Sequence, residues 1–497
     1  MARTPTSSRT RTRTPGALVA VVGFLAFVEF TSGVLQGYYT PMLSDIARHL
    51  GIHDADVNWF EGAQLMLSAL VVPAFAKLGD MFGRKRMLLV STAITAVAAF
   101  VLPFTSTFAV YLVAWAFMGF YVVWLPLEIA LIWSRARRME GSSTITARAA
   151  GLLVAALEGG AIIGALAGGA LVDRLPLVWV LIVPAFLIAA CFFVILFGVK
   201  ESPEKTGGAF DTVGLVLISL SLIGLTGGLS LLRLPGGIAN PLSWIVIVVG
   251  VLLVVPFALW ELRQDDPLID VRMFRSPALG PVFLTAGLFG VSVLGAQAPL
   301  STFARTDPAV YGYGLGTTGF QTSLIIGLYL IAMIAGALLF PVIARLATPR
   351  VTLIGASVLV GIGFLLFLPF HTAYAQVIMN MVIVGIGSGA LVAALPAAAA
   401  SAAPHTQTGV ATGLTNSVKT VGGAIASCVF GIALMHAVAG SAAAEGTAGS
   451  FSGYVTVWVV CGATAFAAAL LLLFVPKQAF TDRAAHSSDG VQDAAAG

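Results

Sequence analysis

Long apolar runs limit the fold of this chain more than any other feature. Hydrophobic residues make up 58% of the 497 residues and charged residues only 10%, whereas a soluble protein carries roughly 25% charged residues. A helix needs about 20 mostly apolar residues to cross a bilayer, while strands of a membrane barrel alternate over segments of about 10 residues. The runs here are unbroken, and backbone hydrogen bonds in lipid must be satisfied internally. The sequence therefore predicts an all-α integral membrane protein and excludes a soluble enzyme.

The apolar runs predict fourteen transmembrane helices, which at about 20 residues each occupy roughly 280 of the 497 residues. Twelve helices would leave apolar sequence unexplained. The first seven are expected near residues 17–40, 57–76, 87–104, 108–134, 149–172, 175–199 and 212–232. The other seven are expected near residues 241–260, 277–303, 316–344, 351–370, 373–400, 408–438 and 454–476.

The distribution of Lys and Arg supports this count and predicts an orientation. With the N-terminus in the cytoplasm, the cytoplasmic segments hold 21 of the 26 Lys and Arg, and the outside loops hold four. The remaining one, Lys419, falls within a helix. We therefore expect a multi-pass protein of the cell membrane with both termini in the cytoplasm. Polar composition predicts disordered tails at residues 1–16, which are basic, and at residues 477–497.

Two pairs of similar segments indicate an internal repeat. Residues 76–104 resemble residues 344–370, and residues 119–126 resemble residues 389–396, at offsets of 266 to 270 residues. These matches relate helices 2 to 4 to helices 10 to 12, and such repeats are typical of secondary transporters. Chance similarity between apolar helices is the alternative.

The repeat predicts how the chain is divided. An N-terminal six-helix bundle is expected at residues 17–199 and a C-terminal six-helix bundle at residues 277–476. A linker at residues 200–276 holds the two inserted helices, numbers 7 and 8.

The loop after the second helix, which starts at Ala76, reads Ala-Lys-Leu-Gly-Asp-Met-Phe-Gly-Arg-Lys-Arg. Gly83 can supply a tight turn, and Arg84 and Lys85 fit the cytoplasmic preference for cations, but Asp80 sits unfavourably at a helix C-terminus unless a cation or another helix meets it. The loop resembles the signature loop of the major facilitator superfamily, with alanine in place of its first glycine. The resemblance implies that these residues form a charge latch that closes the cytoplasmic side. A solvated loop that only sets topology is the alternative.

The fifth helix carries Gly160, Gly164 and Gly168 at a spacing of four, followed by Gly169. Small residues at this spacing allow two helices to approach closely in lipid. The run resembles the glycine-rich motif of the superfamily's drug:proton antiporters, but Ala165 stands where that motif has proline. An ordinary close-packed helix pair is the alternative reading.

Resemblance to the fourteen-span drug:proton antiporters extends over most of the chain. Residues 210–211 are similar to that family's start of the inserted helices, residues 260–275 to its connector between helices 8 and 9, and residues 413–423 to its helix 13. It implies the major facilitator fold, with two six-helix bundles and two inserted helices. Two departures concern proton coupling. Trp115 lies near the position of the arginine expected in helix 4, and Glu29 matches the family's helix-1 acid only loosely.

Charged residues inside predicted membrane helices are candidates for proton coupling or substrate binding. A charge at the bilayer centre costs about 2.5–3.5 kcal/mol on insertion scales, so such residues are rare and often functional. At about 1.5 Å per residue, Glu29, Glu158 and Lys419 lie at mid-depth, Glu128 nearer the cytoplasm and Glu61 near the outside. We rank Glu61 lowest. The alternative for each acid is a structural pairing with a polar neighbour.

Aromatic and amide side chains near these acids could line an amphiphile-binding cavity, because such cavities combine apolar walls with a few polar anchors. Contact with lipid or with a neighbouring helix is the alternative for each. The candidates are Phe30, Gln36, Tyr38, Trp124, Gln297, Gln321 and Asn380.

These features together predict proton-coupled efflux of hydrophobic or cationic small molecules by alternating access. The proton is the expected coupling ion. No other cofactor, metal, nucleic acid or obligate protein partner is expected, because the sequence has no metal-ligand spacing, catalytic triad, nucleotide-binding loop or folded basic face. An uncoupled or importing facilitator of a small organic solute is the first alternative. A membrane sensor or scaffold that transports nothing is the second.

Overall fold

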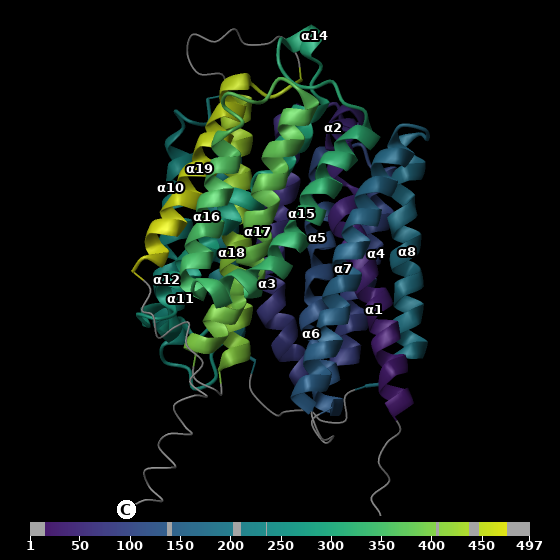
Figure 1. Cartoon of the computed structure of the whole chain (residues 1–497), viewed down its shortest axis with the longest axis vertical. Helices are drawn as coiled ribbons and strands as arrows, with labels where there is room; N and C mark the ends of the chain where they lie inside the picture. Colours follow the sequence, from purple (N-terminus) through teal and green to yellow (C-terminus); the bar gives the residue numbers. More distant parts are fainter. Residues whose placement is uncertain are drawn as a thin grey trace, which may run out of the picture.

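The structure, a computed structural model, describes residues 15–136, 142–201, 210–234, 236–403, 407–436 and 447–474. These residues form helices joined by loops and no strand (Figure 1). Thirteen helices are long and apolar enough to cross a membrane, and α16 (Pro349–Leu365), with 17 residues, takes the place of the predicted eleventh span. The predicted all-α membrane fold is confirmed. The predicted tail at residues 477–497 and nearly all of that at residues 1–16 lie outside the described residues.

The helices of the first half end close to the predicted boundaries, and most extend further. They are α1 (Pro15–Tyr38), α3 (Val57–Phe82), α4 (Arg84–Val101), α5 (Phe108–Met118) continued by η4 (Gly119–Val123) and α6 (Trp124–Ala136), α7 (Ser142–Val172) and α8 (Leu177–Gly198). The sequence placed the end of the second span at residue 76, whereas α3 continues to Phe82. A polar residue ends an apolar run, but it does not end a helix.

The second half repeats this series after two inserted helices. The inserted hairpin consists of α9 (Thr212–Leu232), followed by α10 (Pro241–Leu252) and α11 (Val254–Glu261). The second half consists of α12 (Gly280–Val293) with α13 (Gln297–Arg305), α15 (Gly319–Leu346), α16, α17 (Tyr374–Ala402), α18 (Thr408–Met435) and α19 (Phe451–Leu472). Two short helices, α2 (Leu43–Leu50) and α14 (Pro308–Tyr311), were not predicted because neither has a long apolar run.

Each half has its own hydrophobic core, and equivalent helices pair in both. Helix α1 packs on α7 and α4 on α8 in the first half, as α12 packs on α18 and α16 on α19 in the second. The halves meet where α3 packs on α18 and where α7 packs on α15. Helix α9 packs on both α3 and α18, with Leu222 against Met66, Leu70 and Ala424. The hairpin therefore covers one of the two seams between the halves.

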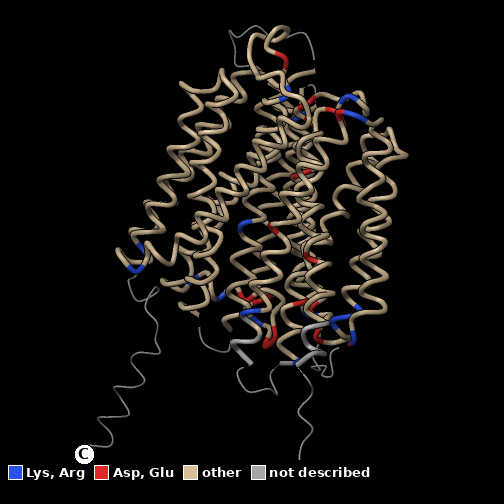
Figure 2. The backbone as a smooth tube through the Cα atoms, turned by 45° about the vertical axis from the view of Figure 1, so that its right-hand side comes forward, with Lys and Arg blue, Asp and Glu red and all other residues tan. Residues whose placement is uncertain are grey.

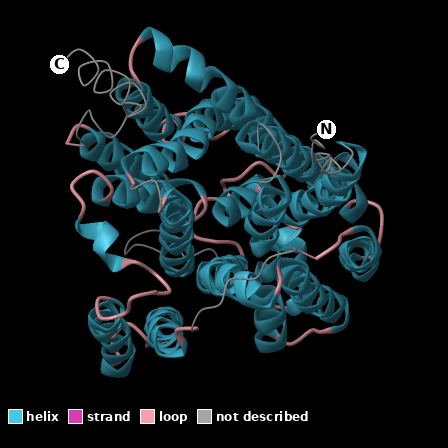
Figure 3. Ribbon diagram, turned by 90° about the horizontal axis from the view of Figure 1, so that it is seen from below, coloured by secondary structure: helices cyan, strands magenta, loops and turns pink. Residues whose placement is uncertain are grey.

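Charged side chains gather at the two ends of the bundle, with few between them (Figure 2). Helix α1 begins and α19 ends on the side drawn at the bottom of Figure 1, where the loop between α3 and α4 also lies. We call this side the termini face, and Figure 3 views the bundle from it. The opposite side is called the far face.

Candidate functional site

A cavity of about 1210 Å³ lies between the two halves. Residues of α1, α3, α6 and α7 line it from the first half, and residues of α12, α15, α17 and α18 line it from the second. At the termini face the lining includes Lys77, Asp80 and the exposed Asp266. Towards the middle of the bundle it includes Gln36 and Gln297. The cavity is thus open to the termini face.

Contacts between the halves close the far face. The Arg305 guanidinium, at the end of α13, binds both carboxylate oxygens of Asp45 on α2, each at 2.8 Å. Ser427 Oγ on α18 donates to the Asn58 carbonyl on α3 at 3.0 Å. Asp173, after α7, accepts from the amides of Gly319 and Phe320 at the start of α15, at 2.7 and 2.9 Å. The described conformation is therefore open at one face and latched at the other.

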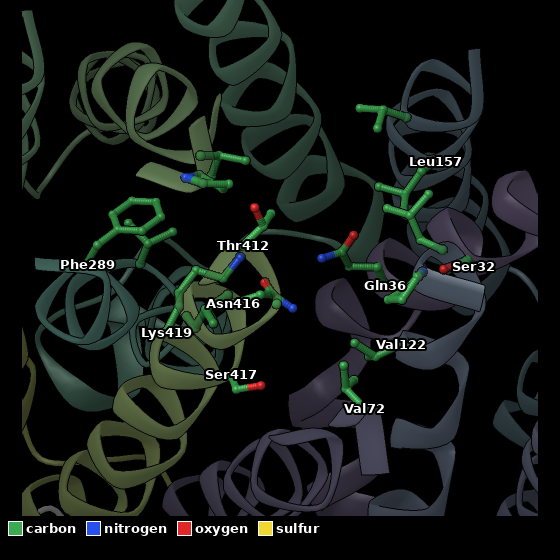
Figure 4. Close-up of a pocket in the computed structure, with 18 of the residues that line it drawn as sticks. Ser32, Gln36, Val72, Val122, Leu157, Phe289, Thr412, Asn416, Ser417 and Lys419 are labelled. Atoms are coloured by element: carbon green, nitrogen blue, oxygen red, sulfur yellow. The ribbon is translucent and has the colours of Figure 1, made fainter. Parts of the chain in front are cut away.

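Two side chains of opposite charge, one from each half, line the cavity. Glu158 lies on α7 of the first half and Lys419 on α18 of the second, and both line the cavity. They interact electrostatically, yet no ion pair or hydrogen bond to either side chain is found among the described residues. Figure 4 shows Lys419 beside Asn416, with Gln36 on the opposite wall. The cavity thus holds an acid and a base that are both available to a ligand.

Glu29 and Glu128 lie elsewhere, although the sequence grouped them with Glu158. Both are fully buried in the first half, on α1 and α6, and neither lines the cavity. Their carboxyl groups interact with each other, and apart from this contact their four oxygens have no hydrogen-bond partner among the described residues. Counting residues along a span predicts the depth of a residue, but depth does not give the side of the helix on which the residue lies.

Only part of the predicted cavity set lines this cavity. Gln36 and Gln297 do, whereas Phe30, Tyr38, Trp124, Gln321 and Asn380 do not. Phe30 and Trp124 pack in the core of the first half, where Trp124 is fully buried.

The other three misplaced candidates have structural partners. Tyr38 Oη donates to the Val180 carbonyl at 2.8 Å, and Asn380 Nδ2 donates to the Phe370 carbonyl at 2.7 Å. Gln321 belongs to the capping box at the start of α15, where its Oε1 accepts from the Thr318 amide. A polar side chain in a membrane helix can be satisfied by backbone groups of its own half, and the sequence pattern does not distinguish this from exposure to a cavity.

Sequence reasoning missed several lining residues. Thr412, Asn416 and Ser417 line the cavity next to Lys419. Their signal was available, because residues 412, 416 and 419 lie on one face of a helix. Tyr329 and Trp458 also line the cavity, but nothing in the sequence distinguishes them from other buried aromatic residues.

The loop between α3 and α4 is tied to its own half. Arg84 Nη2 pairs with Asp80 Oδ1 at 2.6 Å, and Arg84 Nη1 donates to the Ala130 carbonyl of α6 at 2.7 Å. A cation thus meets Asp80 at its helix end. In this open conformation the pair lies within the first half, and Asp80 lines the cavity mouth.

Glu201, which the sequence analysis did not name, binds the part of this loop where α4 begins. Glu201, after α8, accepts from the amides of Lys85 at 3.0 Å and Arg86 at 3.2 Å. These amides lie in the first turn of α4, where an anion is favourable. Lys85 Nζ in turn donates to the Leu196 carbonyl at 2.7 Å. Gly83 makes the turn with a positive φ of 118°.

Replacing Gly83 by alanine is expected to lower the melting temperature of the purified protein. This backbone conformation disfavours any side chain, and the new Cβ would lie 2.6 Å from Glu201 Oε2. Strain of this kind costs about 1–3 kcal/mol. Thermal unfolding in detergent measures it, with Gly355→Ala as the control because a Cβ at Gly355 meets open space. Equal melting temperatures for the two variants would contradict the assignment.

The glycines of α7 lie against the backbone of α1. A Cβ on Gly160 would lie 2.1 Å from the Phe30 carbonyl oxygen, and one on Gly168 would lie 2.1 Å from that of Tyr38. Gly164 is similarly close to Val34.

The other side of α7 and the facing side of α1 also depend on glycine. Gly169 packs on Gly319 of α15, where its Cβ would lie 2.4 Å from the carbonyl oxygen. Gly33 and Gly37 of α1 fit against α7 in the same way, and the sequence analysis overlooked them.

Two similar helical halves about a central cavity, open at one face and closed at the other, are typical of secondary membrane transporters. The family model for the Major Facilitator Superfamily matches residues 25–427, and the chain belongs to this superfamily. The chain is therefore a multi-pass transporter embedded in lipid, and not an enzyme.

Its relatives include exporters and resistance proteins. The puromycin resistance protein of Streptomyces alboniger is 27% identical over 459 residues, covering 87% of this chain and 84% of the relative. The tetracenomycin C resistance and export protein of Streptomyces glaucescens is 24% identical, covering 88% and 79%. A quinolone resistance protein of Staphylococcus aureus is 27% identical over a shorter match that covers 57% and 60%.

Solved structures share the fold at low sequence identity. A peptide transporter in complex with sulfate gives a TM-score of 0.64 at 15% identity, covering 95% of this chain and 96% of that chain. A nucleoside transporter gives a TM-score of 0.62 at 13% identity, covering 92% and 98%.

Proposed function

We propose that this transporter exports hydrophobic or cationic small molecules in exchange for protons. The observation that carries the proposal is the cavity between the halves, which has mostly apolar walls and a carboxyl group, Glu158, among its lining residues. Apolar walls with a few polar anchors suit drug-like molecules. The names of the relatives, which refer to resistance and export, support the outward direction.

The proposed orientation places the termini face in the cytoplasm of a cell membrane. It rests on the excess of Lys and Arg in the segments assigned to that face. A cavity open to this face receives substrate from the cytoplasm or the inner leaflet. Closing the termini face and opening the far face then releases it outside.

The proposed proton carriers are the intramembrane carboxyl groups. Glu158 can exchange a proton with the cavity directly, since it lines the cavity without an ion-pair partner in the described part of the chain. Glu29 and Glu128 form a buried carboxyl pair with no ion-pair partner in the described part of the chain, and we propose that they share a proton. Proton loss at either site would change the charge inside the first half.

Proteoliposomes with an imposed pH gradient test this proposal. We expect a cationic lipophilic dye to move against its own gradient, and we expect Glu158→Gln or Glu29→Gln to abolish the uphill movement because a glutamine cannot release a proton. Glu61→Gln is the matched control, since Glu61 is also a membrane carboxyl but neither lines the central cavity nor belongs to the Glu29–Glu128 pair. Dye that only equilibrates, equally in all variants, would refute proton coupling.

An uncoupled or importing facilitator is the second candidate. Ala165 and Trp115 favour it, because they replace a proline and an arginine of the antiporter pattern, and Trp115 is buried among aromatic rings. It predicts dye flux that does not respond to a pH gradient. A sensor or scaffold would instead show no substrate-dependent flux and would tolerate both Asp80→Asn and Glu158→Gln.

A further inference from the structure

Most charged groups that line the cavity are already neutralised by partners. At the termini face, Lys77 forms an ion pair with Asp266, and Arg84 forms one with Asp80. Asp270 accepts from the Arg272 amide at 3.1 Å and from Gln407 Nε2 at 3.3 Å.

Among the described lining residues, this leaves Glu158 and Lys419 as the two charged side chains without a direct partner. They attract each other, but they are farther apart than an ion pair. A charge within a membrane protein that faces a cavity without a partner marks a substrate or ion pathway. Both groups line the same cavity of about 1210 Å³, so a ligand that carries two opposite charges could satisfy both.

The surroundings of Lys419 suit a carboxylate. The amide of Asn416 and the hydroxyl of Ser417 line the same wall, and both can donate hydrogen bonds (Figure 4). Hydrogen bonds from neutral donors beside an ammonium group strengthen binding of an anion. Lys419 is half-buried, which weakens water screening of its charge.

The remaining walls suit an apolar body. Phe289, Tyr329 and Trp458, all nearly buried, line the cavity from the second half. The parts of these rings that reach the cavity offer an apolar surface to a flat ligand. The site therefore offers an anion-binding side chain, a cation-binding side chain and aromatic walls within one cavity.

We propose that the preferred substrates are zwitterionic amphiphiles, with a carboxylate that binds Lys419 and a cationic nitrogen that binds Glu158. The inference rests on the proposed export function and names the substrate class within it. Such a molecule bridges α7 of the first half and α18 of the second. It also explains why a cavity with mostly apolar walls has a lysine among its lining residues.

Rhodamine B and its ethyl ester test this assignment, because they share a cationic aromatic body and differ in one carboxylate. Fluorescence anisotropy with the purified full-length protein in detergent measures the affinity of each dye. We expect rhodamine B to bind about tenfold more tightly, which corresponds to about 1.4 kcal/mol.

Variants locate the preference. Lys419→Met is expected to bind the two dyes equally, while Lys419→Arg keeps the preference because it retains the charge. Glu158→Gln is expected to weaken both dyes by a similar factor, since both carry the cation. Gel filtration confirms that each variant is folded.

The comparison of the two dyes on the unmodified protein stands even if a variant does not fold. Equal affinities, no binding of either dye, or a preference that survives Lys419→Met would overturn the zwitterion assignment. None of these results affects the export proposal, which is measured by uphill transport of a cationic dye in proteoliposomes. Conversely, the protein could prefer rhodamine B and yet fail to move a cationic dye against its gradient. That result would refute proton-coupled export but would still support the zwitterion-binding site.

Discussion

Gly160→Leu is expected to prevent the transporter from folding. Even the first carbon of a side chain there would lie 2.1 Å from the Phe30 carbonyl oxygen and 3.0 Å from its carbonyl carbon. These are backbone atoms, so no rotamer change relieves the contact, and α1 and α7 must separate along their length. Without a hydrophobic force between helices in lipid, close packing supplies much of their association, and overpacking of this severity exceeds about 3 kcal/mol.

Fluorescence-detected gel filtration of a fusion to a fluorescent protein measures this result. We expect the monodisperse peak of Gly160→Leu to fall to background. Gly151→Leu is the control, because Gly151 lies on the same helix and a Cβ there meets nothing within 4 Å. If both variants gave the wild-type peak, the close contact between α1 and α7 would be wrong.

Removing the Arg305 side chain is expected to open the far face. Arg305 binds Asp45 across the two halves with both partners largely buried, and the pair can exist only while that face is closed. Breaking a buried ion pair costs about 3–5 kcal/mol when the remaining charge has no other partner, and the cost here is smaller because Asp45 keeps its pair with Arg48. A tenfold rise in the population that is open at the far face needs a free-energy change of only about 1.4 kcal/mol. We therefore expect Arg305→Ala to populate the outward-open state.

Cysteine labelling reports this shift. Gln297→Cys places a thiol in the cavity, and a membrane-impermeant maleimide added at the far face should label it at least about tenfold faster when Arg305 is replaced. The native cysteines are buried and give little background. Arg48→Ala is the matched control, because Arg48 pairs with Asp45 within the same helix and is exposed.

A double variant with the two charges exchanged distinguishes loss of the Arg305–Asp45 ion pair from a general loss of stability. Asp45→Arg combined with Arg305→Asp should return the labelling rate towards wild type, since it restores the attraction between the halves. Labelling that is unchanged by Arg305→Ala, or that is not slowed by the double variant, would mean that other contacts hold this face closed.

The positions of the helices along the chain were predictable, because long apolar runs in the sequence indicate membrane helices directly. The lining of the cavity was not predictable to the same degree. Gln36 and Tyr38 are two residues apart on α1, yet Gln36 faces the cavity while Tyr38 donates to the Val180 carbonyl within its own half. When a helix is apolar on all sides, no amphipathic pattern indicates which side faces the cavity.

The glycine contacts were predictable in kind but not in partner. The spacing of Gly160 and Gly164 indicated a close helix approach, but not that α1 is the helix they contact. Gly33 and Gly37 on α1 have the same spacing of four and could have supplied the partner. Matching two small-residue faces in one sequence is a stronger signal than either face alone.

The inserted hairpin makes the protein asymmetric in the plane of the bilayer. The repeat alone would give two equivalent seams towards the lipid, one at α3 and α18 and one at α7 and α15. Because α9 packs on α3 and α18, lipid meets the hairpin at the first seam and the transporter helices themselves at the second. A molecule that diffuses within one leaflet therefore encounters two different flanks, and its approach to the transporter depends on direction.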